Sequence, residues 1–137
     1  MAPAEHTPLH QGRGRLARPL RPGHLGAELH PDLEVVGEAV QKGTRGEDGY
    51  SGFTARDPET GVEHPTGLEA FLRTRMVTRI VVVGLAGDVC VRATALDGAR
   101  LGFDTTVLRS HTRSVEPDAE PRVFSEMEQA GVEVAAA

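Results

Sequence analysis

The sequence predicts an α/β fold with a mostly parallel sheet, and two observations lead to this prediction. From residue 79 onward, short apolar runs alternate with segments of helical periodicity, in the order strand, helix, strand, helix, strand. The first of these runs, Ile80–Val83, is continuously apolar, as is typical of a parallel strand buried on both faces. Such an alternation favours right-handed crossovers between parallel strands.

The elements before residue 79 are predicted to be short. Residues 39–42 are expected to form a strand and residues 43–65 a long loop. Residues 66–75 predict a helix, because Thr66 can cap the first turn and apolar side chains recur on one face, namely Leu68, Phe71 and Leu72.

The second half of the chain alternates regularly. Residues 79–83 predict a central strand, residues 84–88 a tight exit from it, and residues 90–101 a helix that Gly102 ends. The remaining expectations are a strand at 104–108, a helix at 118–130 with Val123 and Met127 inward, a stop at Gly131 and a last strand at 132–134.

Length and composition restrict the class of protein. The chain has 137 residues, 39% hydrophobic and 26% charged, which fits one soluble domain. A net charge of −5 argues against nucleic acid as a partner, and no apolar stretch approaches the roughly 18 residues of a membrane span. The single cysteine excludes a disulfide framework, which favours a cytoplasmic location. Residues 1–25, rich in Arg, Pro and Gly, predict an irregular or disordered segment.

Cys90 is the first candidate for chemistry. It follows the expected strand 79–83 and a glycine-rich turn, so it is placed at the start of a helix. The N–H groups and partial positive charge of a helix start favour a thiolate and can hold an oxyanion. A single cysteine is also often a small buried hydrophobe, so the position alone leaves both interpretations open.

Three stretches resemble a known family. Residues 84–97, around Cys90, are similar to the cysteine block of the isochorismatase-like cysteine hydrolases, and most of all to that of nicotinamidases. Lys42-Gly43-Thr44, followed by Asp48-Gly49-Tyr50-Ser51-Gly52-Phe53, resembles their lysine block, and residues 26–33 resemble the segment before it. The resemblance covers residues 26–137, which we expect to form a partial hydrolase domain.

The resemblance implies a three-layer, Rossmann-like α/β fold and a hydrolase that cleaves an amide through an acyl-enzyme. Cys90 would be the nucleophile and Lys42 a catalytic cation. The backbone N–H groups of Ala86 and Cys90 would form the oxyanion hole, beside an unusual cis peptide at Leu85–Ala86. Tyr50 and Phe53 would contact the substrate, although aromatic residues in such a loop can equally cover a sheet edge. The implied reaction converts nicotinamide and water to nicotinate and ammonia, in NAD salvage.

The sequence also departs from the family pattern. The family uses an aspartate near its first strand as general base, yet no aspartate precedes Asp32 and residues 1–25 contain no apolar run. We therefore expect the first strand to be missing, through an internal start or a frameshift, and activity to be weak or absent.

The expected metal site is incomplete as well. The family's divalent ion (Zn, Fe or Mn) is bound by an aspartate and histidines, and only His6 occupies a comparable position here. His24 has the wrong offset, and one histidine does not make a catalytic zinc site, which takes three protein ligands.

Other interpretations remain open at this stage. The chain could hydrolyse a carbamoyl or ureido compound, or it could be a noncatalytic remnant that binds other proteins through its sheet. A small-molecule amide is the expected partner, with neither nucleic acid nor membrane, and pairing into a homo-oligomer is open. His64 and His111 could serve Cys90, but their spacing does not support it, and Asp88 is expected to hold the elbow.

Overall fold

The computed structural model describes residues 28–43 and 46–137. The chain divides into two compact units, residues 1–36 and residues 37–137. In the first unit, residues 28–36 are irregular, with a turn in which the Leu33 N–H donates to the carbonyl of His30 at 3.0 Å. The predicted irregular segment 1–25, His6 and His24 lie outside the described residues.

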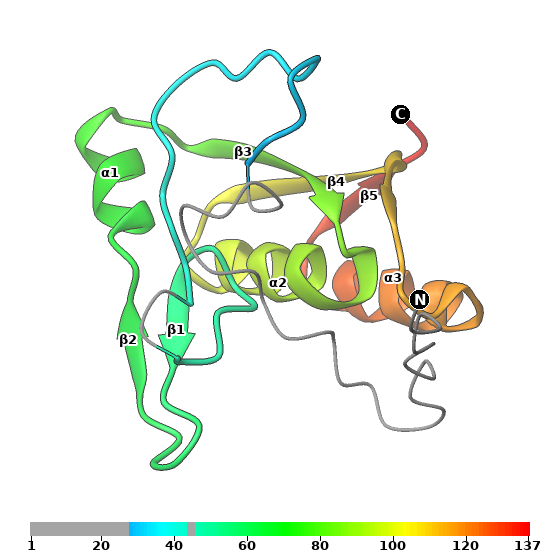
Figure 1. Cartoon of the computed structure of the whole chain (residues 1–137). Coiled ribbons are helices and arrows are strands. Elements are labelled where there is room, and N and C mark those ends of the chain that lie inside the picture. Colours follow the sequence, from blue (N-terminus) through cyan, green and yellow to red (C-terminus); the bar gives the residue numbers. More distant parts are fainter. Residues whose placement is uncertain (1–27, 44–45) are drawn as a thin grey trace, which may run out of the picture. The chain divides into compact units, whose positions relative to one another are not determined.

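A parallel sheet organises the second unit. Its strands are β3 (Arg79–Leu85), β4 (Asp104–Arg113) and β5 (Glu133–Ala135), in that order and both pairs parallel. Helix α2 (Arg92–Arg100) connects β3 to β4, and α3 (Glu120–Gln129), preceded by the short η3 (Pro117–Ala119), connects β4 to β5 (Figure 1). The predicted α/β class is confirmed.

The core lies between the two helices and one face of this sheet. Ala95 of α2, Val107 of β4 and Met127 of α3 are all fully buried. Val82 of β3 and Val134 of β5 pack against the same cluster, so one side chain of each strand joins it. As predicted, Val123 and Met127 point inward from α3.

Strand β3 differs from its prediction. It was expected to be central and buried on both faces, but in the described part of the chain it stands at the end of the sheet order and its residues alternate in exposure. Val81, Val83 and Leu85 are 54%, 49% and 74% exposed. The reason is that α2 and α3 cover one face, and residues 28–43 and 46–137 supply no helix that buries the other.

The segment before α1 is more structured than predicted. Within the expected loop 43–65, β1 (Thr54–Arg56) and β2 (Glu63–Pro65) pair antiparallel. Their turn is built on Asp57, whose carboxylate accepts the N–H groups of Glu59 and Thr60 at 2.8 and 3.0 Å. These hydrogen bonds lower the pKa of Asp57.

Two predictions upstream of β3 have opposite outcomes. Helix α1 (Leu68–Thr74) is confirmed, with Gly67 at φ 96° before it and the Thr66 hydroxyl accepting the Leu68 N–H at 3.3 Å. The predicted strand 39–42 is wrong, because these residues are irregular and no described strand pairs with them.

The remaining boundaries shift by a few residues. A π-helical turn, η2 (Gly87–Val91), precedes α2, so helical structure begins three residues before the predicted start at Cys90. Strand β4 runs five residues beyond its predicted end at Leu108. Gly102 and Gly131, at φ 90° and 92°, end α2 and α3 as predicted, because only glycine adopts this conformation without strain.

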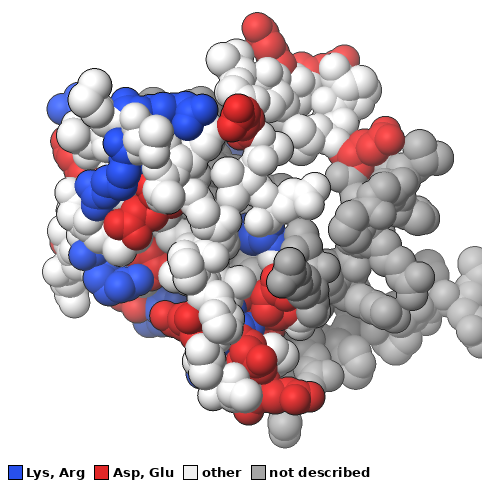
Figure 2. Space-filling model, turned by 90° about the vertical axis from the view of Figure 1, so that its left-hand side faces the viewer, with Lys and Arg blue, Asp and Glu red and all other residues white. Residues whose placement is uncertain are grey.

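Charges of both signs are mixed on the surface. Figure 2 shows basic and acidic side chains as neighbours on the face turned toward the viewer. Several arginines form ion pairs with adjacent carboxylates, including Arg73 with Glu69 and Arg79 with Asp104. Among the described helices, none combines the length and the apolar character needed to cross a membrane.

Candidate active site

Cys90 lies at the elbow between β3 and α2. The strand ends at Leu85, a cis peptide links Leu85 to Ala86, as the resemblance implied, and η2 begins at Gly87. Val91, the next residue after Cys90, is 2% exposed and belongs to the core cluster. Cys90 itself is half-buried, so it stands at the border between the core and the surface.

Lys42 and Cys90 meet. The Lys42 Nζ donates to the Cys90 Sγ at 3.2 Å, although the two residues are 48 positions apart. They are the only lysine and the only cysteine in the chain. A cation in contact with a thiol favours its ionised, nucleophilic form, so this pair is the chemically distinctive contact of the described residues.

Gly49 holds Lys42 in place. Its carbonyl oxygen accepts a second hydrogen bond from Lys42 Nζ. A Cβ at this position would lie 2.5 Å from the backbone nitrogen of Gly43 and 2.7 Å from its Cα. The close approach of the two backbones therefore requires glycine at position 49. Sequence reasoning missed this role, and the only signal was the position of Gly49 inside the segment that resembles the lysine block.

The segment after Gly49 is anchored to α2. The Gly52 N–H donates to the Thr94 hydroxyl at 2.8 Å, and the Thr66 hydroxyl donates to the carbonyl of Gly52 at 2.6 Å. Phe53 is 2% exposed and stacks on Phe103, with ring centroids 5.7 Å apart. Tyr50 is 46% exposed. Of the two predicted substrate contacts, only Tyr50 therefore presents its ring to solvent.

Three other predicted residues are now placed. Both oxygens of Asp88 accept backbone N–H groups, from Val115 at 2.9 Å and Glu116 at 3.0 Å, so this residue holds the elbow as expected. His64 and His111 are exposed, and neither hydrogen-bonds to Cys90. The Nδ1 of His111 instead lies 2.8 Å from the hydroxyl of Ser110.

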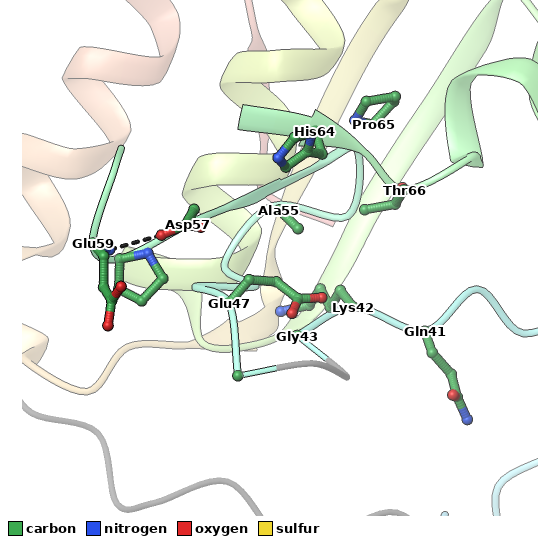
Figure 3. A pocket seen from close by; sticks show the side chains of 12 residues that line it. Gln41, Lys42, Gly43, Glu47, Ala55, Asp57, Glu59, His64, Pro65 and Thr66 are labelled. Atoms are coloured by element: carbon green, nitrogen blue, oxygen red, sulfur yellow. Dashed lines mark hydrogen bonds between the residues drawn. The ribbon is translucent and has the colours of Figure 1, made fainter. Parts of the chain in front are cut away.

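An open cavity of about 690 Å³ lies beside Lys42. Lys42 and Glu47 lie on one side of it, whereas Gln41 points away from the other lining side chains (Figure 3). His64 and the turn residue Asp57 also line it, but Cys90 does not. The cavity therefore reaches the lysine of the pair but not the thiol.

The described residues do not fit the expected metal ion. Within residues 28–43 and 46–137, no three His, Cys, Asp or Glu side chains are grouped so that they could hold one. A catalytic zinc site takes three protein ligands, so we assign no chemical step to a metal.

The sequence matches the isochorismatase domain family over residues 3–137. It is 40% identical over 113 residues to the nicotinamidase/pyrazinamidase of Mycobacterium tuberculosis, an alignment that covers 82% of this chain and 58% of that protein.

Solved structures show the same relationship. The structure of PnC1 from L. infantum in complex with nicotinate is 34% identical and superposes with a TM-score of 0.73, covering 82% of this chain and 56% of that one. The pyrazinamidase of Pyrococcus horikoshii in complex with zinc is 32% identical, with a TM-score of 0.68 and coverage of 82% and 58%. The chain thus spans somewhat more than half the length of these relatives.

Proposed function

Because this chain belongs to the isochorismatase family, we propose that it is an amide hydrolase of the nicotinamidase type with Cys90 as its nucleophile. The observation that carries the proposal is the 3.2 Å contact between Lys42 Nζ and Cys90 Sγ. The site offers a thiol, a cation and an elbow of backbone N–H groups, which is the equipment that acyl transfer requires.

The proposed reaction has two stages. The Cys90 thiol ionises, and its thiolate adds to the carboxamide carbon of nicotinamide. The C–N bond breaks, and the nitrogen takes up the proton that the thiol gave up and leaves as ammonia. This leaves a nicotinoyl thioester on Cys90. Water then adds to the thioester carbonyl, the C–S bond breaks, and nicotinate and the thiol are released. Lys42, in contact with the sulfur, stabilises the thiolate before attack and again when it leaves.

The elbow supplies the groups for the oxyanion. The N–H groups of Val89 and Val91 donate to the carbonyl of Ala86 at 3.1 and 3.0 Å and are therefore occupied. We assign the oxyanion hole to the N–H groups of Ala86 and Cys90. One such donor is worth roughly 2.7–4 kcal/mol of transition-state stabilisation.

The substrate is a small amide with a planar ring. Tyr50 is the exposed aromatic residue of the segment that carries Gly49, and its ring suits stacking on a pyridine. A nicotinamide-hydrolysing enzyme would supply nicotinate for NAD salvage. Both carboxylate oxygens of Asp88 accept backbone N–H groups, so we do not assign Asp88 as the general base.

Ammonia release from nicotinamide by the purified chain tests this function. Pyrazinamide and a ureido compound serve as alternative substrates, and Cys90→Ala is the inactive reference. We expect release from nicotinamide that Cys90→Ala abolishes and that Lys42→Met reduces at least about tenfold. Equal release by the native chain and Cys90→Ala would overturn the proposal, and release from the ureido compound alone would redirect it to that substrate.

A further inference from the structure

The end of β4 and the residues directly after it contact the Cys90 elbow. We call residues 112–116 the clamp segment. The ladder between β3 and β4 shifts register after Val82, so that Gly84 pairs with Thr112 and Leu85 with Arg113. The last residues of β3 before the elbow are therefore paired with the first residues of the clamp segment.

Asp88 forms the second connection. Its two carboxylate oxygens accept the N–H groups of Val115 and Glu116, 27 and 28 residues further along the chain. A carboxylate that receives two backbone N–H groups makes charge-assisted hydrogen bonds, which are about twice as strong as neutral ones. Asp88 lies two residues before Cys90, so these bonds act directly on the turn that carries the thiol.

Gly87 forms the third connection. A Cβ there would lie 2.7 Å from the Thr112 hydroxyl oxygen and 3.0 Å from that of Ser114. Thr112 is 3% exposed, and both hydroxyl oxygens are buried without a hydrogen-bond partner among the described residues. Burying two hydroxyl groups without hydrogen-bond partners lowers the stability of the fold. Both groups lie where the elbow packs against the clamp segment.

We propose that Asp88 is a positioning residue, which fixes the elbow to the clamp segment and thereby sets where Cys90 meets Lys42. The hydrogen bonds of the Asp88 carboxylate go to the clamp segment and not to the thiol. Asp88 acts through the backbone of the elbow, which it holds in place. The Lys42–Cys90 contact joins an irregular segment to this elbow, so a shift of about 1 Å in either would break the contact. The inference rests on the proposed function only in assuming that Cys90 is the nucleophile.

The rate at which iodoacetamide alkylates Cys90 near neutral pH tests the proposal. Cys90 is the only cysteine, so the reaction reports on one site. The quantity to compare is the Lys42 effect, defined as the ratio of the alkylation rate with Lys42 to the rate after Lys42→Met. We expect this ratio to be about ten in the native chain and to fall below about three in Asp88→Ala, because the thiol no longer meets the ammonium.

Asp97→Ala is the matched control. Asp97 also accepts a tertiary hydrogen bond, from the hydroxyl of Thr54 at 2.9 Å, and one within its own helix, from Arg100 at 3.2 Å, but it lies on α2, seven residues after Cys90. Both variants should unfold at lower temperature, whereas only Asp88→Ala should reduce the Lys42 effect. An undiminished Lys42 effect in folded Asp88→Ala would overturn the proposal.

A milder variant covers failure of Asp88→Ala to fold. Asp88→Asn keeps one oxygen to accept one of the two N–H groups, so the Lys42 effect should lie between those of the native chain and Asp88→Ala. A native ratio in Asp88→Asn would count against the proposal in the same way. Alkylation needs no amide turnover, so a chain that releases no ammonia but shows these ratios would fail the proposed function and still support the clamp.

Discussion

The two members of the reactive pair are held in opposite ways. Cys90 sits on a continuous strand, turn and helix whose neighbours Val91 and Ala95 are buried in the core. Lys42 sits on an irregular, exposed segment, and two hydrogen bonds place it, one to the thiol and one to the carbonyl of Gly49 in residues 46–49, which we call the Gly49 loop. The position of the nucleophile is therefore a property of the core, whereas the position of the cation depends on a few long-range contacts.

This difference separates two kinds of perturbation. A change in the core should unfold the domain together with the elbow, and leave the relation between thiol and ammonium intact in the molecules that remain folded. A change in the Gly49 loop should do the reverse, because it moves Lys42 without opening the core.

Met127→Ala should have the largest effect on stability and tests whether the core holds the segment that carries Cys90. Met127 is fully buried between α3 and the sheet, so its truncation should lower the free energy of unfolding by about 2–5 kcal/mol. Urea unfolding measures this loss. Met76→Ala makes the same substitution at a residue that is 87% exposed and should change stability by less than about 0.5 kcal/mol. Equal losses in the two variants would contradict the assigned core.

Gly49→Ala tests whether the Gly49 loop holds Lys42 against the thiol. The added Cβ would meet the backbone of Gly43 at 2.5 Å, which displaces Lys42, so alkylation of Cys90 should slow about tenfold while the core stays folded. Gly46→Ala, in the same loop, strains a positive φ of 82° but places its Cβ near no atom within 4 Å. If both variants slow alkylation equally, backbone strain rather than the approach to Gly43 is responsible, and the Gly49 assignment is wrong.

The ion pair between Arg92 of α2 and Glu126 of α3 gives the smallest effect. The Glu126 carboxylate accepts two guanidinium hydrogen bonds, one of 2.9 Å from Nε, and these lower the pKa of Glu126 and raise that of Arg92. Because both side chains are more than a third exposed, Glu126→Gln should cost only about 0.5–1 kcal/mol near neutral pH.

The pH dependence follows from the direction of the shift. A carboxyl group whose folded-state pKa is lowered contributes stability above its unfolded pKa and loses it as pH falls through the folded value. The unfolding midpoints of the native chain and Glu126→Gln should therefore differ near neutral pH and converge in acid. Glu128→Gln is the control, and a gap that stays constant down to low pH would show that the ion pair is not its cause.

The sequence predicted those features of the site that depend on residues close together along the chain. The elbow, Cys90 at its turn, the helix ends at Gly102 and Gly131 and the cis peptide were all foreseen, because neighbouring residues along the chain determine them or the family pattern implies them. Lys42 was proposed from the resemblance alone.

The non-local features were not foreseen. The strand expected at 39–42 is irregular because a strand needs a partner, and the described residues offer none. The exposure of Val81 and Val83 likewise depends on what covers the second face of the sheet, which an apolar run does not reveal. The roles of Gly49 and of the clamp segment rest on contacts between distant residues, for which spacing gave no signal.

The central claim is that Lys42 activates Cys90, and alkylation of Cys90 in Lys42→Met tests it most directly. Arg56→Met, which removes an exposed cation from the neighbouring strand β1, is the control. Near neutral pH we expect Lys42→Met to slow iodoacetamide about tenfold and Arg56→Met to change the rate by less than about twofold. Equal rates in the native chain and Lys42→Met would contradict the account.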